Sequence, residues 1–350
     1  MIFTRLRAIA ASASLVTLVA LTGCGASEVV EDSADAVGQG DTRYPLVIEN
    51  CGQTVEIERA PQRVVSLDQN STEILLSLGL AGRIVGTASW TDPILPSLAD
   101  ENEGVPRLSD NAPTYEVVLG ADPDFVTASF GRHYNEGGVV TRDRLAETSV
   151  GSYLSPTDCD NGISVNGGGT RTEPLQVEAL YQEIQELADI FDVADRGAAL
   201  IADLQERATA ATEGVDLGGR SAVFWFADTK TPYTAGGFGS ASLLAELTGM
   251  TNVFADTADD WPAVGWESVV DADPSILVLG DLQRDRFPGD RLDDKIAFLT
   301  ADPLTRTLSA VQRADFIALH GAEMNPSIRF VDALEKIRTW ALEHQDEGEG

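Results

Sequence analysis

Glu116-Val-Val-Leu-Gly-Ala-Asp-Pro-Asp-Phe-Val126 and Glu267-Ser-Val-Val-Asp-Ala-Asp-Pro-Ser-Ile-Leu277 repeat nearly the same pattern. Each stretch has a Glu, an apolar pair, the tripeptide Ala-Asp-Pro and then apolar residues, and the Glu precedes the Pro by seven residues in both. The residue before a proline is disfavoured in helical conformation, so each copy predicts a short helix that ends ahead of its Pro.

A buried strand is expected directly after each helix, at residues 125–128 and 276–279. A helix–strand unit that recurs about half a chain later predicts two similar lobes. The alternative is that Ala-Asp-Pro is simply a common way to enter a strand, but the matched Glu positions favour a repeat.

The amino-terminal segment has the features of an export signal. Arg5 and Arg7 precede an apolar run over residues 8–21 that is too short for a stable membrane span. The run ends in Leu-Thr-Gly-Cys24, which resembles the bacterial lipobox, in which the Cys is lipidated. We expect residues 1–23 to be a lipoprotein signal peptide and Cys24 to anchor the protein outside the cytoplasmic membrane. The alternative is a plain signal peptide with an incidental Cys.

Residues 24–43 are rich in small and acidic residues, which predicts a flexible tether. The remaining chain is long enough for two domains of ordinary size, and a hydrophobic content of 43% can fill their cores. The formal net charge of −32 is opposite in sign to that of a nucleic-acid-binding protein, so we expect no nucleic-acid partner. We interpret the acidity as an aid to solubility or an adaptation to a salty habitat.

Three cysteines are present. If Cys24 carries lipid, Cys51 and Cys159 remain, and an even remainder in an exported chain predicts a disulfide between them. Two free buried thiols are the alternative.

The predicted elements form an α/β chain with two parts of similar plan. Residues 44–173 begin with a hairpin around 50–53 and continue with strands near 63–67, 84–87, 125–128 and 152–154, with Ser71 expected to cap the first helix and another helix over 139–147. Residues 174–217 carry two amphipathic helices, 174–191 and 194–212. Residues 218–345 start the pattern again with a strand at 222–226, a helix at 240–247, a last strand at 316–319 and a helix at 327–343. We therefore expect two Rossmann-like lobes with parallel-rich sheets, joined by a long rigid helix, with a ligand cleft between them.

Several of these stretches together resemble a known family. Arg63-Val-Val-Ser-Leu, Asn70-Ser-Thr-Glu-Ile-Leu-Leu-Ser-Leu-Gly79, the two Glu units and the helical link look like a substrate-binding lipoprotein of an ABC transporter. The subgroup is the one with a rigid interdomain helix, which binds iron–siderophore complexes, cobalamin or haem. The resemblance implies a ligand-capturing protein that is not an enzyme, and we expect it to deliver a ferric siderophore to permease and ATPase subunits. Cobalamin and haem stay open as ligands, and we expect a monomer with no cofactor of its own.

The resemblance also gives Glu116 and Glu267 a role. In the family, one Glu on each lobe docks into an Arg pocket of the permease, and a two-fold permease should meet one matching anion per lobe. The alternative is that each is a solvated carboxylate in the first turn of its helix.

Aromatic, cationic and Met side chains in the loops after strands are the candidate ligand contacts, because rings can stack on a large chelate and guanidinium groups can pair with its oxygens. For any single residue, ordinary packing is an equally good explanation. The candidates are Trp90, Arg132, Tyr134, Trp225, Tyr233, Trp261, Met324 and Arg329.

Two other classes of function are disfavoured by the sequence. A site for a free metal ion would need converging His and carboxylate ligands, and only His133, His320 and His344 exist, so we expect no direct metal site. An exported hydrolase is the rival from another class, but the chain has neither Gly-x-Ser-x-Gly nor His-Glu-x-x-His.

Overall fold

The structure is a computed structural model that describes residues 40–159 and 169–344. All of them belong to one compact unit, Ala36–Gly350. The predicted signal peptide, the lipidation site Cys24 and most of the tether lie outside the described residues. Within the described part of the chain, no helix combines the length and hydrophobicity needed to cross a membrane.

The first lobe is built on a five-stranded parallel sheet with strand order β5-β4-β3-β6-β7. Its strands are β3 (Val64–Ser66), β4 (Ile84–Ala88), β5 (Arg107–Ser109), β6 (Phe125–Ala128) and β7 (Gly151–Leu154). Its helices are α1 (Gln69–Ser77), α2 (Ala99–Asn102), α3 (Tyr115–Gly120) and α4 (Arg142–Glu147). β3 and β6 are buried along their whole length, as expected for strands of a parallel sheet with both faces covered.

The second lobe has a sheet of strand order β10-β8-β11-β12, in which all neighbours are parallel, and β9 pairs antiparallel with β8. The strands are β8 (Ser221–Ala227), β9 (Tyr233–Thr234), β10 (Thr251–Asn252), β11 (Ile276–Asp281) and β12 (Phe316–His320). The helices are α7 (Ser240–Leu247), α8 (Trp266–Ala272), α9 (Leu292–Ala301), α10 (Ser309–Arg313) and α11 (Phe330–Glu343).

The predicted repeat is visible in the topology. In each lobe the first strand of the sheet lies between the next parallel strand along the chain and the strand that follows Ala-Asp-Pro: β3 between β4 and β6, and β8 between β10 and β11. The short helices α3 and α8 precede β6 and β11, and each carries its Glu as the second residue. The prediction of two α/β lobes with parallel-rich sheets is confirmed.

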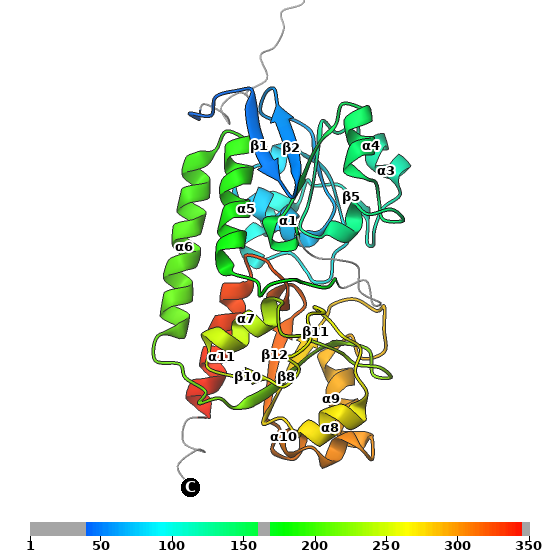
Figure 1. Cartoon of the computed structure of the whole chain (residues 1–350), viewed down its shortest axis with the longest axis vertical. Coiled ribbons are helices and arrows are strands. Elements are labelled where there is room, and N and C mark those ends of the chain that lie inside the picture. The colour runs from blue at the N-terminus through cyan, green and yellow to red at the C-terminus, as the bar shows by residue number, and fades with distance from the viewer. Residues whose placement is uncertain (1–39, 160–168, 345–350) are drawn as a thin grey trace, which may run out of the picture. The chain divides into compact units, whose positions relative to one another are not determined.

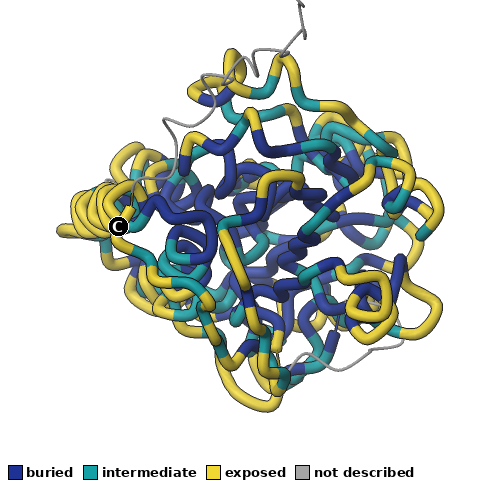
Figure 2. Tube along the Cα trace, turned by 90° about the horizontal axis from the view of Figure 1, so that it is seen from above, coloured by how far each residue is buried: buried dark blue, intermediate teal, exposed yellow. Residues whose placement is uncertain are grey.

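Two consecutive helices, α5 (Val177–Ile190) and α6 (Ala194–Thr212), connect the lobes, and Figure 1 shows α6 extending from the first lobe to the second. Near its start, Arg196 donates to the Leu78 carbonyl of the first lobe (3.0 Å), and near its end Arg207 pairs with Asp332 of α11 (2.5 Å). One apolar cluster runs through both lobes and both helices, with members such as Ile74, Phe125, Ile184, Leu204, Phe224 and Ile337. Figure 2 shows this buried interior enclosed by exposed helix faces and loops.

An antiparallel hairpin, β1 (Leu46–Asn50) and β2 (Gln53–Ile57), packs against the first lobe. Its turn is attached twice. The Asn50 side chain donates to the Leu154 carbonyl (2.8 Å) and accepts from the Leu154 N–H (3.0 Å), and a disulfide joins Cys51 to Cys159 with Cα atoms 4.8 Å apart. The predicted disulfide is confirmed.

Some helix starts differ from the predictions because local polar contacts override periodicity. α1 is capped by Asp68, whose carboxylate accepts from the Ser71 N–H (3.0 Å), so Ser71 is inside the helix and does not cap it. α4 starts at Arg142, later than expected, because the N–H groups of Val139 and Val140 donate to the His133 carbonyl and hold these residues in a turn.

Candidate functional site

The carboxyl ends of the parallel strands in the two lobes face each other, and ligands of open parallel sheets bind beyond such ends. A cavity of about 30 Å³ lies here, with walls from both lobes. Its lining residues are Phe130, Arg132, Gly239, Ser240, Ala241, Asp260, Trp261, Met324, Asn325 and Pro326. A drug-sized ligand needs roughly 300–1,000 Å³, so the lobes must separate before a large chelate can enter.

The first lobe contributes Arg132 from a single turn of 3₁₀-helix, Gly131–His133, that follows β6. The N–H of Gly131 donates to the Asp158 carboxylate (2.5 Å), which fixes the start of this turn. The guanidinium of Arg132 lies over the Phe130 ring, 4.1 Å from its centroid. A stacked guanidinium of this kind keeps its in-plane N–H groups available for oxygens of a ligand.

Burial and neighbouring charges shift the pKa of Arg132. Desolvation lowers this pKa from its ordinary value, and the negative charges of Asp68 and Asp158 oppose the shift. Repulsion by Arg284 and Arg286 lowers it further, so the charges of these two groups act on Arg132. The Arg132 side chain is nevertheless exposed, so it is crowded by protein on several sides while remaining open to the cleft. Three guanidinium groups thus interact electrostatically in a chain whose net charge is −32.

Arg284 and Arg286 come from the loop after β11 in the second lobe. The loop is folded around Asp290, whose carboxylate accepts from the Arg286 N–H (2.7 Å) and the Phe287 N–H (2.9 Å) and lies 3.4 Å from the Arg284 Nε. The Asp290 side chain is almost fully buried, so it anchors the loop from within.

Sequence reasoning missed these two arginines, although a signal existed. The repeat of the two Glu units continues past the strands, where the first copy leads to Phe130-Gly-Arg132 and the second to Gln283-Arg-Asp-Arg-Phe287. Extending the alignment of the two copies by ten residues would have placed a cationic loop on each lobe.

Aromatic rings with partial exposure surround the arginines. Trp261 packs at a tilt on Phe226 (centroids 4.7 Å apart), and Tyr233 meets Phe287 edge to face (5.9 Å). The Arg284 guanidinium lies 5.6 Å from the Phe226 centroid, and that of Arg286 lies 5.4 Å from the Phe287 centroid. All four rings are half-buried, so each keeps a face or edge that a ligand can contact.

Three other candidate residues are packed inside the lobes. The Tyr134 hydroxyl donates to the Val126 carbonyl (2.9 Å) and lies 3.1 Å from the Tyr153 carbonyl. The Trp225 indole N–H lies between two carbonyls within its own lobe, and only 1% of the residue is exposed. Trp90 is 8% exposed, donates to the Thr87 hydroxyl (2.9 Å) and is covered by a guanidinium, that of Arg107.

Met324 and Arg329 follow β12. Met324 lines the cleft cavity but is fully buried. Arg329 forms a buried ion pair with Glu73 of α1 and donates to the Pro93 carbonyl (2.6 Å), so its guanidinium joins the two lobes. Desolvation lowers its pKa, but the hydrogen bonds and charge of Glu73 outweigh this effect, and the pKa is raised overall.

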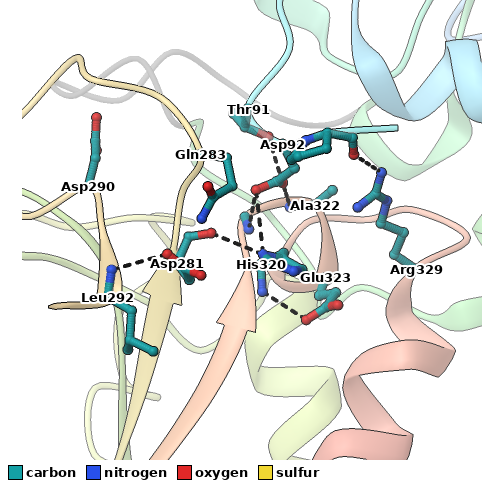
Figure 3. Close-up of polar contacts among 12 residues, drawn as sticks. Thr91, Asp92, Asp281, Gln283, Asp290, Leu292, His320, Ala322, Glu323 and Arg329 are labelled. Carbon is teal, nitrogen blue, oxygen red and sulfur yellow. Dashed lines mark hydrogen bonds and ion pairs between the residues drawn. The ribbon is translucent and has the colours of Figure 1, made fainter. Parts of the chain in front are cut away.

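Figure 3 shows further contacts across the same junction. The Asp92 carboxylate in the first lobe accepts from the N–H groups of Gly321 (3.3 Å) and Ala322 (2.7 Å) in the second. One ring nitrogen of His320 lies 4.0 Å from Asp92 and 3.2 Å from the Asp281 carbonyl. Together with Glu73 and Arg329, these contacts hold the lobes together beside the linking helices.

A larger recess of about 1,040 Å³ runs along the outer edge of β12, between α6, α11 and the loop at 93–97. It takes in part of the junction, including His320 and Arg329, but not Arg132 or Trp261, which line the cleft cavity. The cleft is therefore the candidate ligand site.

Glu116 and Glu267 are both exposed, one in the first turn of α3 and the other in the first turn of α8. In Figure 1 both helices lie on the side of the molecule opposite α6. The pKa of Glu116 is lowered by its own backbone N–H and by Thr114 at the helix start.

The described residues contain no group of three or more His, Cys, Asp or Glu side chains arranged to hold a metal ion. The cleft cavity is instead lined by Arg132 and by the rings of Phe130 and Trp261, and such groups can recognise an anionic, partly apolar molecule.

Comparison with known proteins identifies the family. Residues 64–322 match the periplasmic binding protein family. A cobalamin-binding protein of Halobacterium salinarum is 23% identical over 327 residues, which cover 92% of this chain and 80% of the relative.

Solved structures share the fold. A protein of an ABC-type Fe³⁺-hydroxamate transport system from Saccharomonospora viridis superimposes with a TM-score of 0.68 at 26% identity, covering 87% of this chain and all (100%) of that one. A periplasmic haem-binding protein from Roseiflexus sp. RS-1 gives a TM-score of 0.61 at 19% identity, covering 81% of this chain and 98% of that one. With two lobes of the expected plan and a family match over most of its length, the chain belongs to the periplasmic binding proteins and is the substrate-binding protein of an ABC transporter.

Proposed function

We propose that this protein captures an anionic ferric siderophore and delivers it to an ABC importer. The observation that carries the proposal is the placement of three arginines on the loops after β6 and β11, Arg132 in the first lobe and Arg284 with Arg286 in the second, whose charges act on one another. Guanidinium groups pair with carboxylate, catecholate or hydroxamate oxygens through forked hydrogen bonds. A cleft that closes with one such group on the first lobe and two on the second would grip the chelate from both sides.

The half-buried aromatic residues support a ligand with apolar surface. Phe130 and Trp261 line the cavity, and the rings of Tyr233 and Phe287 lie at the loop that carries Arg284 and Arg286. A ferric tricatecholate suits both features, because it combines a multiple negative charge with aromatic rings.

Cobalamin is the second candidate, favoured by the name of the Halobacterium relative, which spans 92% of this chain. The side chains around a corrin ring are largely uncharged amides, which gain less from three guanidinium groups than an anion does. Haem also carries carboxylates, so the arginines alone do not exclude it.

Quenching of tryptophan fluorescence tests the proposal, because Trp261 lines the cleft. The purified protein without residues 1–24 is titrated with a ferric tricatecholate, a ferric trihydroxamate, cyanocobalamin and haemin. We expect the tricatecholate to bind most tightly. The triple variant Arg132→Ala/Arg284→Ala/Arg286→Ala should lose about 100-fold or more in affinity for it, since a hydrogen bond to a charged group contributes about 1.5–3 kcal/mol.

Arg306→Ala, an exposed arginine outside the cleft, is the matched control and should leave affinity unchanged. Affinity of the wild type should also fall with added salt, whereas that of the triple variant should be nearly insensitive. If cyanocobalamin binds most tightly of the four ligands, and the triple variant binds it as well as the wild type does, the cobalamin proposal replaces the siderophore proposal.

We also propose that Cys24 is lipidated and that the tether lets the protein work above the membrane. The basis is the lipobox-like Leu-Thr-Gly-Cys24 behind an apolar run. Expressed in a lipoprotein-processing bacterium, the wild type should enter the detergent phase on phase partitioning, and Cys24→Ser should move to the aqueous phase. Equal partitioning of the two would contradict lipidation.

A further inference from the structure

Arg171, which is not among the three arginines discussed above, contacts both sides of the cleft. The side chain of Arg171 is only 8% exposed, and its Nε donates to the carboxylate of Asp260 in the second lobe (2.6 Å). Its other nitrogens reach the first lobe, with Nη1 donating to the Thr157 carbonyl (2.6 Å) and Nη2 lying 3.5 Å from the Asp158 carboxylate. Both carboxylates are nearly buried, with side chains 5% and 10% exposed.

The backbone around Arg171 belongs to the second lobe. Its N–H donates to the Ala258 carbonyl (2.9 Å), the Asp260 N–H donates to the Gly169 carbonyl (3.0 Å), and Thr170 forms an isolated antiparallel bridge with Asp259. Among the described residues, the guanidinium group of Arg171 links this segment to the first lobe at Thr157 and Asp158.

Asp158 also accepts a hydrogen bond within the first lobe. Its Oδ2 accepts from the Gly131 N–H, and so holds the turn that carries Arg132 into the cleft. The next residue, Cys159, forms the disulfide with Cys51 and so ties the segment after β7 to the β1–β2 hairpin. A movement of Asp158 would therefore be passed on to the cleft guanidinium.

We infer that Asp158, Arg171 and Asp260 form a latch that holds the cleft shut and couples closure of the lobes to the position of Arg132. The cavity has Asp260 in its wall, so the latch borders the space that a ligand would take. Removing one member of a buried ion pair is strongly destabilising, because the partner charge is left buried and unpaired. The closed arrangement is therefore sensitive to each of the three residues, whereas the contacts beside the linking helices remain when the latch opens.

Spin labels on the ligand-free protein measure the opening directly. Glu136→Cys and Asp285→Cys place the labels on exposed positions of the two cleft loops. We expect Arg171→Gln to shift the distance distribution between the labels to longer values and to broaden it. Arg207→Gln removes another arginine that pairs with two carboxylates, on the α6–α11 contact, and should leave the distribution as in the wild type.

Hydrogen exchange separates the latch from the positioning role of Asp158. Asp158→Asn can still accept from the Gly131 N–H but loses the charge that faces Arg171, so it should open the lobes while the Gly131 amide stays protected. Asp158→Ala loses both contacts, and exchange at Gly131 should accelerate by about tenfold or more.

Both measurements use ligand-free protein, so they do not depend on which chelate is bound. If Arg171→Gln destabilises the fold, Asp260→Asn loosens the anchor of the Arg171 guanidinium within the second lobe with a smaller change of shape. An interlobe distance unchanged by Arg171→Gln or Asp260→Asn would overturn the latch. Equal Gly131 exchange in Asp158→Asn and Asp158→Ala would overturn the coupling to Arg132.

Discussion

At the scale of single residues, Glu183 is unusual because its carboxyl group is buried without a cationic partner among the hydrogen bonds described below. It lies on α5, fully buried, and accepts hydrogen bonds from the hydroxyls of Ser129 (3.2 Å) and Ser155 (2.6 Å), which directly follow β6 and β7. Desolvation raises its pKa to about 8, the two hydroxyls oppose the shift, and the nearby charges of Asp68 and Glu186 add to it. A protonated carboxyl therefore supports the strand ends that carry the cleft loops at neutral pH.

This raised pKa predicts the sign of a pH effect on stability. Below the ordinary pKa of 4.5 the group is protonated in both the folded and unfolded states. Between that value and about 8 the unfolded chain releases the proton and the folded chain keeps it, so the free energy of unfolding falls as pH rises. The loss can reach about 1.4 kcal/mol per pH unit.

Glu183→Gln should remove much of this slope, because an amide keeps the shape and does not ionise. Urea unfolding at several pH values between 5 and 8 measures it. Glu178→Gln, an exposed change on the same helix, is the control and should keep the slope of the wild type. A Glu183→Gln protein with the wild-type slope would show that Glu183 ionises alike in both states. Asp68, whose pKa is also raised by burial, accounts for a residual slope of the same sign.

At the scale of elements, the sequence predicted what local chemistry determines. The helices at 194–212 and 240–247 and the strand at 125–128 have the predicted bounds, because their apolar periodicity and end signals lie within the segments themselves. The strands β5 and β10 were not predicted, since they are short and form only by pairing with β4 and β8.

The difference between local and long-range contacts also explains why the side-chain directions of the candidate cleft residues could not be predicted. A position after a strand end indicates the edge of the sheet but not the direction of the side chain. Trp225 lies within β8 and turns into the core, whereas Trp261 in a loop lines the cavity. Arg329 was expected to meet a ligand, and its pairing with Glu73 involves residues that are 256 positions apart, which no local pattern reveals. Whether each candidate contacts ligand stays a prediction.

At the scale of the whole molecule, internal symmetry connects the fold to delivery. The order β4-β3-β6-β7 of the first lobe recurs as β10-β8-β11-β12 in the second, and the helices α3 and α8 present one exposed Glu each at the second helical position. Val117, next to Glu116, is one of the few exposed large apolar side chains among the described residues, at 41%. Each lobe therefore offers one exposed carboxylate at an equivalent position to a two-fold partner.

We predict that Glu116 and Glu267 are required together for transport but not for ligand binding. Each carboxylate can accept a forked hydrogen bond from an arginine of the permease, and such exposed pairs fix orientation more than they add affinity. The variant Glu116→Ala/Glu267→Ala should bind the chelate as the wild type does while uptake in cells is nearly abolished, and either single variant should reduce uptake in part. Glu147→Ala/Glu246→Ala removes the same charge from one exposed site on each lobe and is the matched control. Uptake by the first pair that equals that of the control, or a loss of chelate affinity, would show that these carboxylates do not dock the permease.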